Sequence, residues 1–326
     1  MLRSRMLVIW LAITSGLPLP GAAGDTLLAH HFDVGQGDMT LVQAGGCNVL
    51  IDAGRWDRDD VLEHLAITGV GHIHIVIATH PHADHIGQLD EVLAEYPVSR
   101  IWRMGWEHDS QTYRRVSDAV DQVVADTGAT EEHPRAGDWT SCGGLDLRVV
   151  HPIEPLEDIH DNLSVRIEHE HVTLLYTGDA EAQHEREKLK RGEALTADFL
   201  HLGHHGSRTS TTSGFLRAVD PDITLYSAGR DNTYGHPHDE VIERIRDHGT
   251  EIYGTAEHGT VVLEATADGI AVHTARDDAL EEFEAAGTDC SISMSLQHVG
   301  RESLEGRFPG SYVTIWGREL ENWVRH

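Results

Sequence analysis

The sequence predicts an α/β fold in which mixed sheets and helices are stacked in layers. Stretches with strand character lead and trail each half of the chain, and stretches with helical spacing lie between them. This order differs from the regular alternation of a Rossmann fold. The chain has 326 residues, of which 40% are hydrophobic, so it can fill the core of one large domain.

The elements of the first half follow from residue type and spacing. Apolar runs bounded by glycine turns predict strands at 27–35, 38–54, 72–80 and 100–105. Apolar residues that repeat every three to four positions predict helices at 58–69, 86–96 and 110–128.

The second half is interpreted by the same criteria. They predict strands at 145–152, 163–169, 172–179, 197–206, 223–229 and 251–255, and a closing hairpin over 259–275. Helices are expected at 182–190, near Phe215 and at 239–248. The resulting domain should run from residue 27 to 276. Residues 277–326 begin as an acidic linker and continue as a C-terminal extension of unknown role.

The N-terminus is typical of an export signal. Arg3 and Arg5 precede the apolar run 6–13, and small residues follow up to Ala23. We therefore expect residues 1–23 to be cleaved and the protein to be exported to the periplasm or the medium; the alternative is a retained anchor. The run is too short for a membrane span, and no other stretch is long and apolar enough to be one.

The chain is strongly acidic, with a formal net charge of −29. Its only lysines are Lys188 and Lys190, and a dispersed acidic surface poor in lysine suggests a halophilic protein; an ordinary acidic secreted protein is the alternative. Such a surface repels nucleic acid at low salt. At molar salt the Debye length falls to about 3 Å, so the charge does not exclude a DNA substrate.

The cysteines make a zinc site built from thiolates improbable, because Cys47, Cys142 and Cys290 show no C-x-x-C spacing. Export would permit a disulfide, and Cys47 with Cys142 is the preferred pair because both fall within the main domain.

The chemistry is concentrated in the stretch His80-Pro81-His82-Ala83-Asp84-His85, at the end of a predicted strand. Imidazole nitrogen and carboxylate oxygen are ligands for divalent zinc, manganese and iron. His80 and His82 alternate along an extended turn and can reach one ion. Asp84 and His85 turn onto the next helix and can reach a second one.

This H-x-H-x-D-H pattern resembles the signature of the metallo-β-lactamase superfamily. The further motifs "DVGQGD", "TGDA", "HHGS" and "YGHPH" are similar in kind and order to those of its ComEC-like branch of competence proteins, over roughly 240 residues. The resemblance implies a four-layer αβ/βα sandwich with mixed sheets over 27–276. It also implies two divalent ions, zinc or manganese.

The resemblance assigns roles residue by residue. His80 and His82 would hold one ion, Asp84 and His85 the other, and Asp179 would bridge them, although Asp179 could instead cap the following helix. His205 would complete the second site and His204 would be a neighbouring group or proton donor, or the two could be exchanged. On an extended strand, adjacent side chains point to opposite faces, so both should not bind the same ion.

One usual histidine ligand is missing, because "DNLSVRI" places Asn162 and Ser164 where most of the superfamily has a histidine. The site of His80 and His82 should therefore bind its ion weakly, or be completed by water or substrate. His151 and His160 are alternative ligands.

Further residues have predicted supporting roles. His236, fixed by a following proline, would donate a proton to the leaving oxygen, with a hydrogen-bonded loop histidine as the alternative. Asn162, Ser207 and Thr209 could bind substrate oxygens. The glycine-rich turn 33–38 could hold an anion or pack under the metals. Asp52 would orient a ligand histidine.

These expectations describe an exported metal-dependent hydrolase. A metal-bound hydroxide, oriented by Asp84, would attack a phosphodiester or another small substrate, and DNA is one candidate. Carboxylic esters, thioesters and lactams are the alternative substrates, and a metal-binding module without turnover is the alternative from another class. The sequence does not determine the oligomeric state.

Overall fold

A computed structural model describes residues 26–276 of the chain. The expected export signal and the C-terminal extension lie outside these residues. Within them, no helix is long and apolar enough to cross a membrane.

The larger of two sheets has eight strands in the order β15-β14-β1-β2-β3-β4-β5-β6. Their bounds are β1 Leu27–His31, β2 Thr40–Ala44, β3 Cys47–Ile51, β4 Ile73–Ala78, β5 Val98–Arg103, β6 Thr130–Glu132, β14 Val261–Thr266 and β15 Gly269–Thr274. The strands from β3 to β6 pair in parallel, and the other pairs are antiparallel.

The smaller sheet has seven strands in the order β13-β12-β11-β10-β9-β8-β7. Their bounds are β7 Trp139–Cys142, β8 Leu145–His151, β9 Ser164–His169, β10 Val172–Tyr176, β11 Phe199–His201, β12 Ile223–Tyr226 and β13 Glu251–Gly254. Parallel pairing runs from β10 to β13, and antiparallel pairing from β7 to β10. The prediction of mixed sheets is confirmed.

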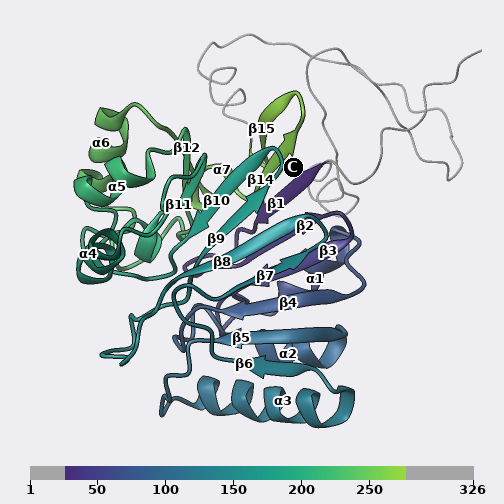
Figure 1. Cartoon of the computed structure of the whole chain (residues 1–326). Coiled ribbons are helices and arrows are strands. Elements are labelled where there is room, and N and C mark those ends of the chain that lie inside the picture. The colour runs from purple at the N-terminus through teal and green to yellow at the C-terminus, as the bar shows by residue number, and fades with distance from the viewer. Residues whose placement is uncertain (1–25, 277–326) are drawn as a thin grey trace, which may run out of the picture. The chain divides into compact units, whose positions relative to one another are not determined.

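Helices cover the outer face of each sheet (Figure 1). The helices are α1 Val61–Ile67, α2 Leu89–Glu95, α3 Gln111–Thr127, α4 Ala182–Arg191, α5 Ser213–Val219, α6 Asp239–His248 and α7 Thr255–His258. The longest, α3, begins where the Ser110 side chain accepts a hydrogen bond from the Tyr113 amide and ends at Gly128 in the left-handed conformation.

Three apolar cores separate four layers. One lies between the two sheets, one between the larger sheet and α1 to α3, and one between the smaller sheet and α4 to α6. Successive side chains of a strand point to opposite faces of the sheet, so one strand contributes to two cores. In β4, Ile75 and Ile77 face the other sheet, while Val76 and Ala78 face the helices. The predicted four-layer sandwich is the fold that the structure shows.

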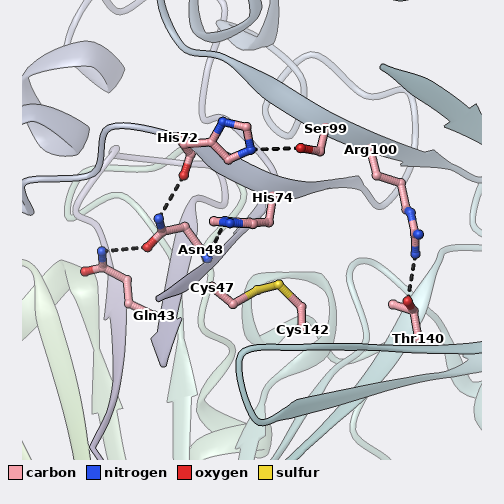
Figure 2. The surroundings of a disulfide bond; sticks show 9 residues. All are labelled: Gln43, Cys47, Asn48, His72, His74, Ser99, Arg100, Thr140 and Cys142. Carbon is pink, nitrogen blue, oxygen red and sulfur yellow. Dashed lines mark hydrogen bonds between the residues drawn. A yellow bond between two sulfur atoms is a disulfide. The ribbon is translucent and has the colours of Figure 1, made fainter. Parts of the chain in front are cut away.

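The predicted disulfide is confirmed and joins the two sheets. Cys47 on β3 is bonded to Cys142 at the end of β7, 95 residues later (Figure 2). Close by, Arg100 of β5 donates a hydrogen bond to the Thr140 hydroxyl of β7 at 2.7 Å.

Some local predictions were wrong or incomplete. The short strands β6 and β7 and the single turn α7 were not predicted, because three or four residues give too little periodicity. The strand expected over 197–206 ends at His201, and a 3₁₀ turn, Gly203–Gly206, takes the place of its second half.

Candidate metal centre

The histidine motif forms the turn that follows β4. Asp52, at the end of β3, accepts hydrogen bonds from the Thr79 amide at 2.8 Å and from the Thr79 hydroxyl at 2.7 Å. The same carboxylate lies 2.7 Å from His85 Nδ1. Asp52 is therefore the acceptor that orients His85, as its place in the sequence suggested.

Asp179, which follows β10, lies between two sets of imidazoles. Its Oδ1 is 3.2 Å from His85 Nε2 and 3.7 Å from His205 Nε2. Its Oδ2 is 3.5 Å from His80 Nε2 and 3.7 Å from His204 Nε2. Each carboxylate oxygen thus faces a different set of ring nitrogens, an arrangement that suits a ligand shared by two cations.

Two groups of potential ligand atoms result, with Asp179 in both. The first consists of His80, His82 and Asp179, and the second of Asp38, His85, Asp179 and His205. Asp84 joins the second group from the motif turn, because its Oδ2 lies 3.3 Å from His205 Nε2. The structure therefore brings all six predicted metal ligands into one cluster.

The buried atoms of this cluster fit a metal. His85 Nε2, His205 Nε2 and Asp179 Oδ1 are buried and have no hydrogen-bond partner. His205 Nδ1 donates to the Ser227 carbonyl at 2.9 Å, so Nε2 faces Asp84 and Asp179 with either a proton or, in the neutral ring, a bare lone pair that can bind a metal. Such atoms are costly to bury together unless a cation lies between them.

The charges of the cluster also favour a bound cation. Burial opposes ionisation of Asp179, but His85, His205 and His80 outweigh it and hold the pKa of Asp179 well below its usual range. Burial likewise opposes protonation of His85, but Asp179 and Asp52 raise the pKa of His85 well above its usual value. A proton and a metal ion compete for the same nitrogen, so metal affinity should fall as the pH falls.

The turn Gly203–Gly206 positions the adjacent pair His204 and His205. Both have positive φ, 52° and 56°, a conformation that is uncommon for histidine. The expectation of an extended strand here was wrong. In the left-handed turn the two rings approach opposite oxygens of Asp179, with His205 buried and His204 partly exposed.

Asn162 holds the aspartate in place. Its Oδ1 accepts a hydrogen bond from the Asp179 amide at 2.9 Å, and its Nδ2 donates to the His160 carbonyl at 2.7 Å. Gly178 fits only because it lacks a side chain, since an added Cβ would lie 2.6 Å from Asn162 Oδ1. Both polar atoms of Asn162 serve the backbone, so its geometry supports a positioning role rather than the predicted contact with substrate.

His236 lies over the cluster, with its ring centroid 5.7 Å from that of His204 and 6.1 Å from that of His205. Gln36 accepts a hydrogen bond from the Gly229 amide, which directs the Gln36 NH₂ group toward His236 Nδ1 at 3.4 Å. Nδ1 is then the acceptor, and Nε2 carries the hydrogen in the neutral ring. Burial and neighbouring imidazoles lower the pKa of His236 to about 4.

The two alternative ligands have different surroundings. The His160 ring lies 5.4 Å from that of His82 and 5.6 Å from that of His204, beside the first group. His151 does not join the cluster; it lies beside Asp161 and Glu187 in a separate group. The prediction that His151 could replace the missing ligand was wrong, because β8 ends on the side of α4.

The remaining predicted side chains surround His204 and His205. The hydroxyl of Thr209 is 3.4 Å from His204 Nδ1 and 3.0 Å from that of Ser207. The sequence interpretation missed the role of Asp38, at the end of the glycine-rich turn. Its Oδ2 lies 3.7 Å from His85 Nδ1, and its Oδ1 is buried without a hydrogen-bond partner.

The glycine before Asp38 explains how that turn reaches the motif. A Cβ at Gly37 would lie 2.4 Å from the Asp84 carbonyl oxygen, to which the Asp38 amide donates at 3.1 Å. The sequence did contain a signal for this role of Asp38. An acidic residue directly follows a glycine, and glycine allows two backbone segments to approach closely.

Comparisons with known proteins agree with this geometry. The family model of the metallo-beta-lactamase superfamily matches residues 32–230. The sequence is 28% identical over 251 residues to ComE operon protein 3 of Bacillus subtilis, covering 70% of this chain and 32% of that protein. It is 28% identical over 235 residues to competence protein ComA of Neisseria gonorrhoeae, covering 71% of this chain and 31% of that protein.

A shorter match is to ribonuclease Z of Mycolicibacterium gilvum, 46% identical over 67 residues, covering 20% of this chain and 22% of that protein. The chain spans about a third of the length of the two longer relatives. Because the family model matches more than half of the chain, the chain belongs to the metallo-β-lactamase superfamily, generally metal-dependent hydrolases, and it is similar to the ComEC-like competence proteins.

Proposed function

We propose that this protein is an exported metal-dependent hydrolase that cleaves phosphodiesters, with DNA as one candidate substrate. The observation that supports this most is the placement of Asp179, whose two oxygens face two different sets of imidazoles. Two cations sharing one carboxylate suit a phosphoryl centre, where both the attacking and the leaving oxygen need stabilisation.

The superfamily fold binds divalent metals, usually two, and the donor set suggests zinc or manganese here. His85, His205 and Asp84 would hold one ion, His80 and His82 the other, and Asp179 both. His204 or His160 would compensate for the missing ligand of the first ion, which should be the weaker one. Bound divalent ions lower the pKa of coordinated water toward about 7.

The protein's own groups would complete the reaction. Asp84, which is partly exposed and close to His205, would orient the attacking water. The His236 Nε2–H group would hydrogen-bond to the leaving oxygen. Ser207 and Thr209 offer hydroxyls beside His204 to the other oxygens of the substrate.

The phosphodiester assignment also draws on relatives. One relative, ribonuclease Z, is by its name a ribonuclease. DNA is a candidate substrate because the chain is similar to competence proteins. A site of this kind can also attack carbonyl carbon, so esters, thioesters and lactams belong in the test.

The test is a substrate panel with the metal-loaded protein at high and low salt. Bis-p-nitrophenyl phosphate, an alkyl phosphodiester and single-stranded DNA are expected to be hydrolysed. Nitrocefin and a thioester are expected to react poorly. Turnover of nitrocefin or thioester alone would refute the phosphodiester assignment while leaving the metal site in place.

His236→Ala tests the leaving-group role in the same panel. We expect unchanged metal content and a rate that falls by about 10²–10³-fold with the alkyl leaving group but less with p-nitrophenolate, whose delocalised charge gains less from the Nε2–H hydrogen bond. His273→Ala, on β15, is the matched control. An equal loss with both leaving groups would contradict the role of His236.

Export is part of the proposal and is supported by the disulfide, because disulfides persist mainly in oxidising compartments. The mature chain should begin near Gly24. N-terminal sequencing of the protein recovered outside the cytoplasm would check this, and an intact Met1 would refute it.

A further inference from the structure

A second group of ligand atoms lies apart from the catalytic cluster. His151 ends β8, Glu187 lies on α4, and Asp161 belongs to the segment that connects β8 to β9. Their ligand atoms all lie within 4.8 Å of one another. His151 is fully buried and Asp161 nearly so, while Glu187 is partly exposed.

The tautomer of His151 leaves a bare nitrogen in this group. His151 Nδ1 lies 3.1 Å from the Asn162 carbonyl oxygen, which can only accept, so Nδ1 carries the hydrogen. The Nε2 lone pair of the neutral ring then faces Glu187 Oε2 at 3.3 Å and Asp161 Oδ1 at 3.8 Å. Because His151 and Asp161 are almost fully buried, a cation between these three acceptors would remove their mutual repulsion.

Burial, followed by the neighbouring charge of Lys188, lowers the pKa of His151 to about 2, in agreement with the neutral tautomer that the hydrogen bond to the Asn162 carbonyl indicates.

The surroundings hold the ligands in position. Asp161 Oδ2 accepts the amides of Glu157 and Asp158, which leaves Oδ1 free for the group. His184 Nδ1 accepts the Glu181 amide at 3.0 Å, so its Nε2 carries the hydrogen and faces Asp161 Oδ1 at 3.6 Å. Ligand carboxylates and histidines in metal sites are supported in this way by a second layer of hydrogen bonds.

The proposed ligands also lie close to a buried ammonium group, that of Lys188. Asp161, Glu185 and Glu187 act on Lys188, whose ammonium nitrogen is buried and has no hydrogen-bond partner within residues 26–276.

We propose that His151, Asp161 and Glu187 bind one divalent transition-metal ion in a site separate from the catalytic pair. One imidazole and two carboxylates suit zinc or manganese. The ion would join the end of β8, helix α4 and the connecting segment. Because that segment also carries His160 and Asn162, which contacts the Asp179 amide, the ion would stabilise the wall of the catalytic centre.

The experiment counts metal ions in the full-length protein. Wild-type protein and Glu187→Gln are each saturated with zinc, and in a second series with manganese, and are then dialysed and analysed by mass spectrometry. We expect the variant to hold one ion fewer per chain and to unfold at a lower temperature. Glu193→Gln, just after α4, is the matched control and should hold as many ions as the wild type. Equal counts in Glu187→Gln and wild type would overturn the proposal.

A second measurement does not depend on a variant. Anomalous diffraction at the metal edge from crystals of the loaded wild-type protein should show a peak beside His151 Nε2. Peaks at the catalytic positions without a peak beside His151 would overturn the proposal. The carboxylates of this group would then be balanced by the Lys188 ammonium and not by a metal ion.

Discussion

Asp179→Asn is expected to remove bound metal and hydrolysis together. Asp179 faces both sets of imidazoles, and among residues 26–276 it is the only carboxylate that belongs to both groups of potential ligand atoms. The amide has nearly the same shape but no charge, so neither ion keeps its shared ligand. Removing a group that hydrogen-bonds to a metal ligand typically lowers metal affinity or activity about 10–100-fold. Removing a direct ligand should therefore lower the rate by more than about 10²-fold.

Metal content per chain and the rate on bis-p-nitrophenyl phosphate measure this result. The fold should survive, because Asn162 is bonded to the backbone amide of residue 179 and not to its side chain. Asp84→Asn is the informative partner, since it should retain part of the metal while losing most of the rate. Asp268→Asn, in the exposed β14–β15 turn, should change neither quantity. Full metal content and full rate in Asp179→Asn would show that the two ions do not share a site.

Removing the disulfide is expected to lower the free energy of unfolding by about 2–5 kcal/mol. The bond closes a long loop, because Cys47 and Cys142 are 95 residues apart, and it joins the two sheets (Figure 2). A loop of this length gives a value near the top of that range, since the bond restricts the unfolded chain most when the loop is long. Denaturant unfolding of Cys47→Ala/Cys142→Ala against the wild type measures the difference.

Reduction provides the control for this prediction. A reducing agent should destabilise the wild type by a similar amount and should leave the double variant unchanged, because only the wild type has a bond to lose. Equal stability of the two proteins under oxidising conditions would contradict the prediction, as would free thiols at both positions in non-reducing mass mapping.

The sequence alone determined the architecture and the first half of the site. Helix α6 begins and ends where its apolar spacing predicted, and the buried run of β4 leads into the H-x-H-x-D-H turn. These features are local, because periodicity and turn residues act over a few neighbouring positions. The motif ligands are close together in sequence, so their spacing already places them at one strand end.

Only the tertiary structure decided the rest, because it depends on contacts between distant segments. His204 and His205 approach opposite oxygens of Asp179 through a left-handed turn that no propensity predicts. Asp38 reaches the cluster because Gly37 packs against the Asp84 backbone. His151, a plausible ligand by sequence distance, instead faces Asp161 and Glu187, since the direction of β8 and the position of α4 determine which side chains it meets.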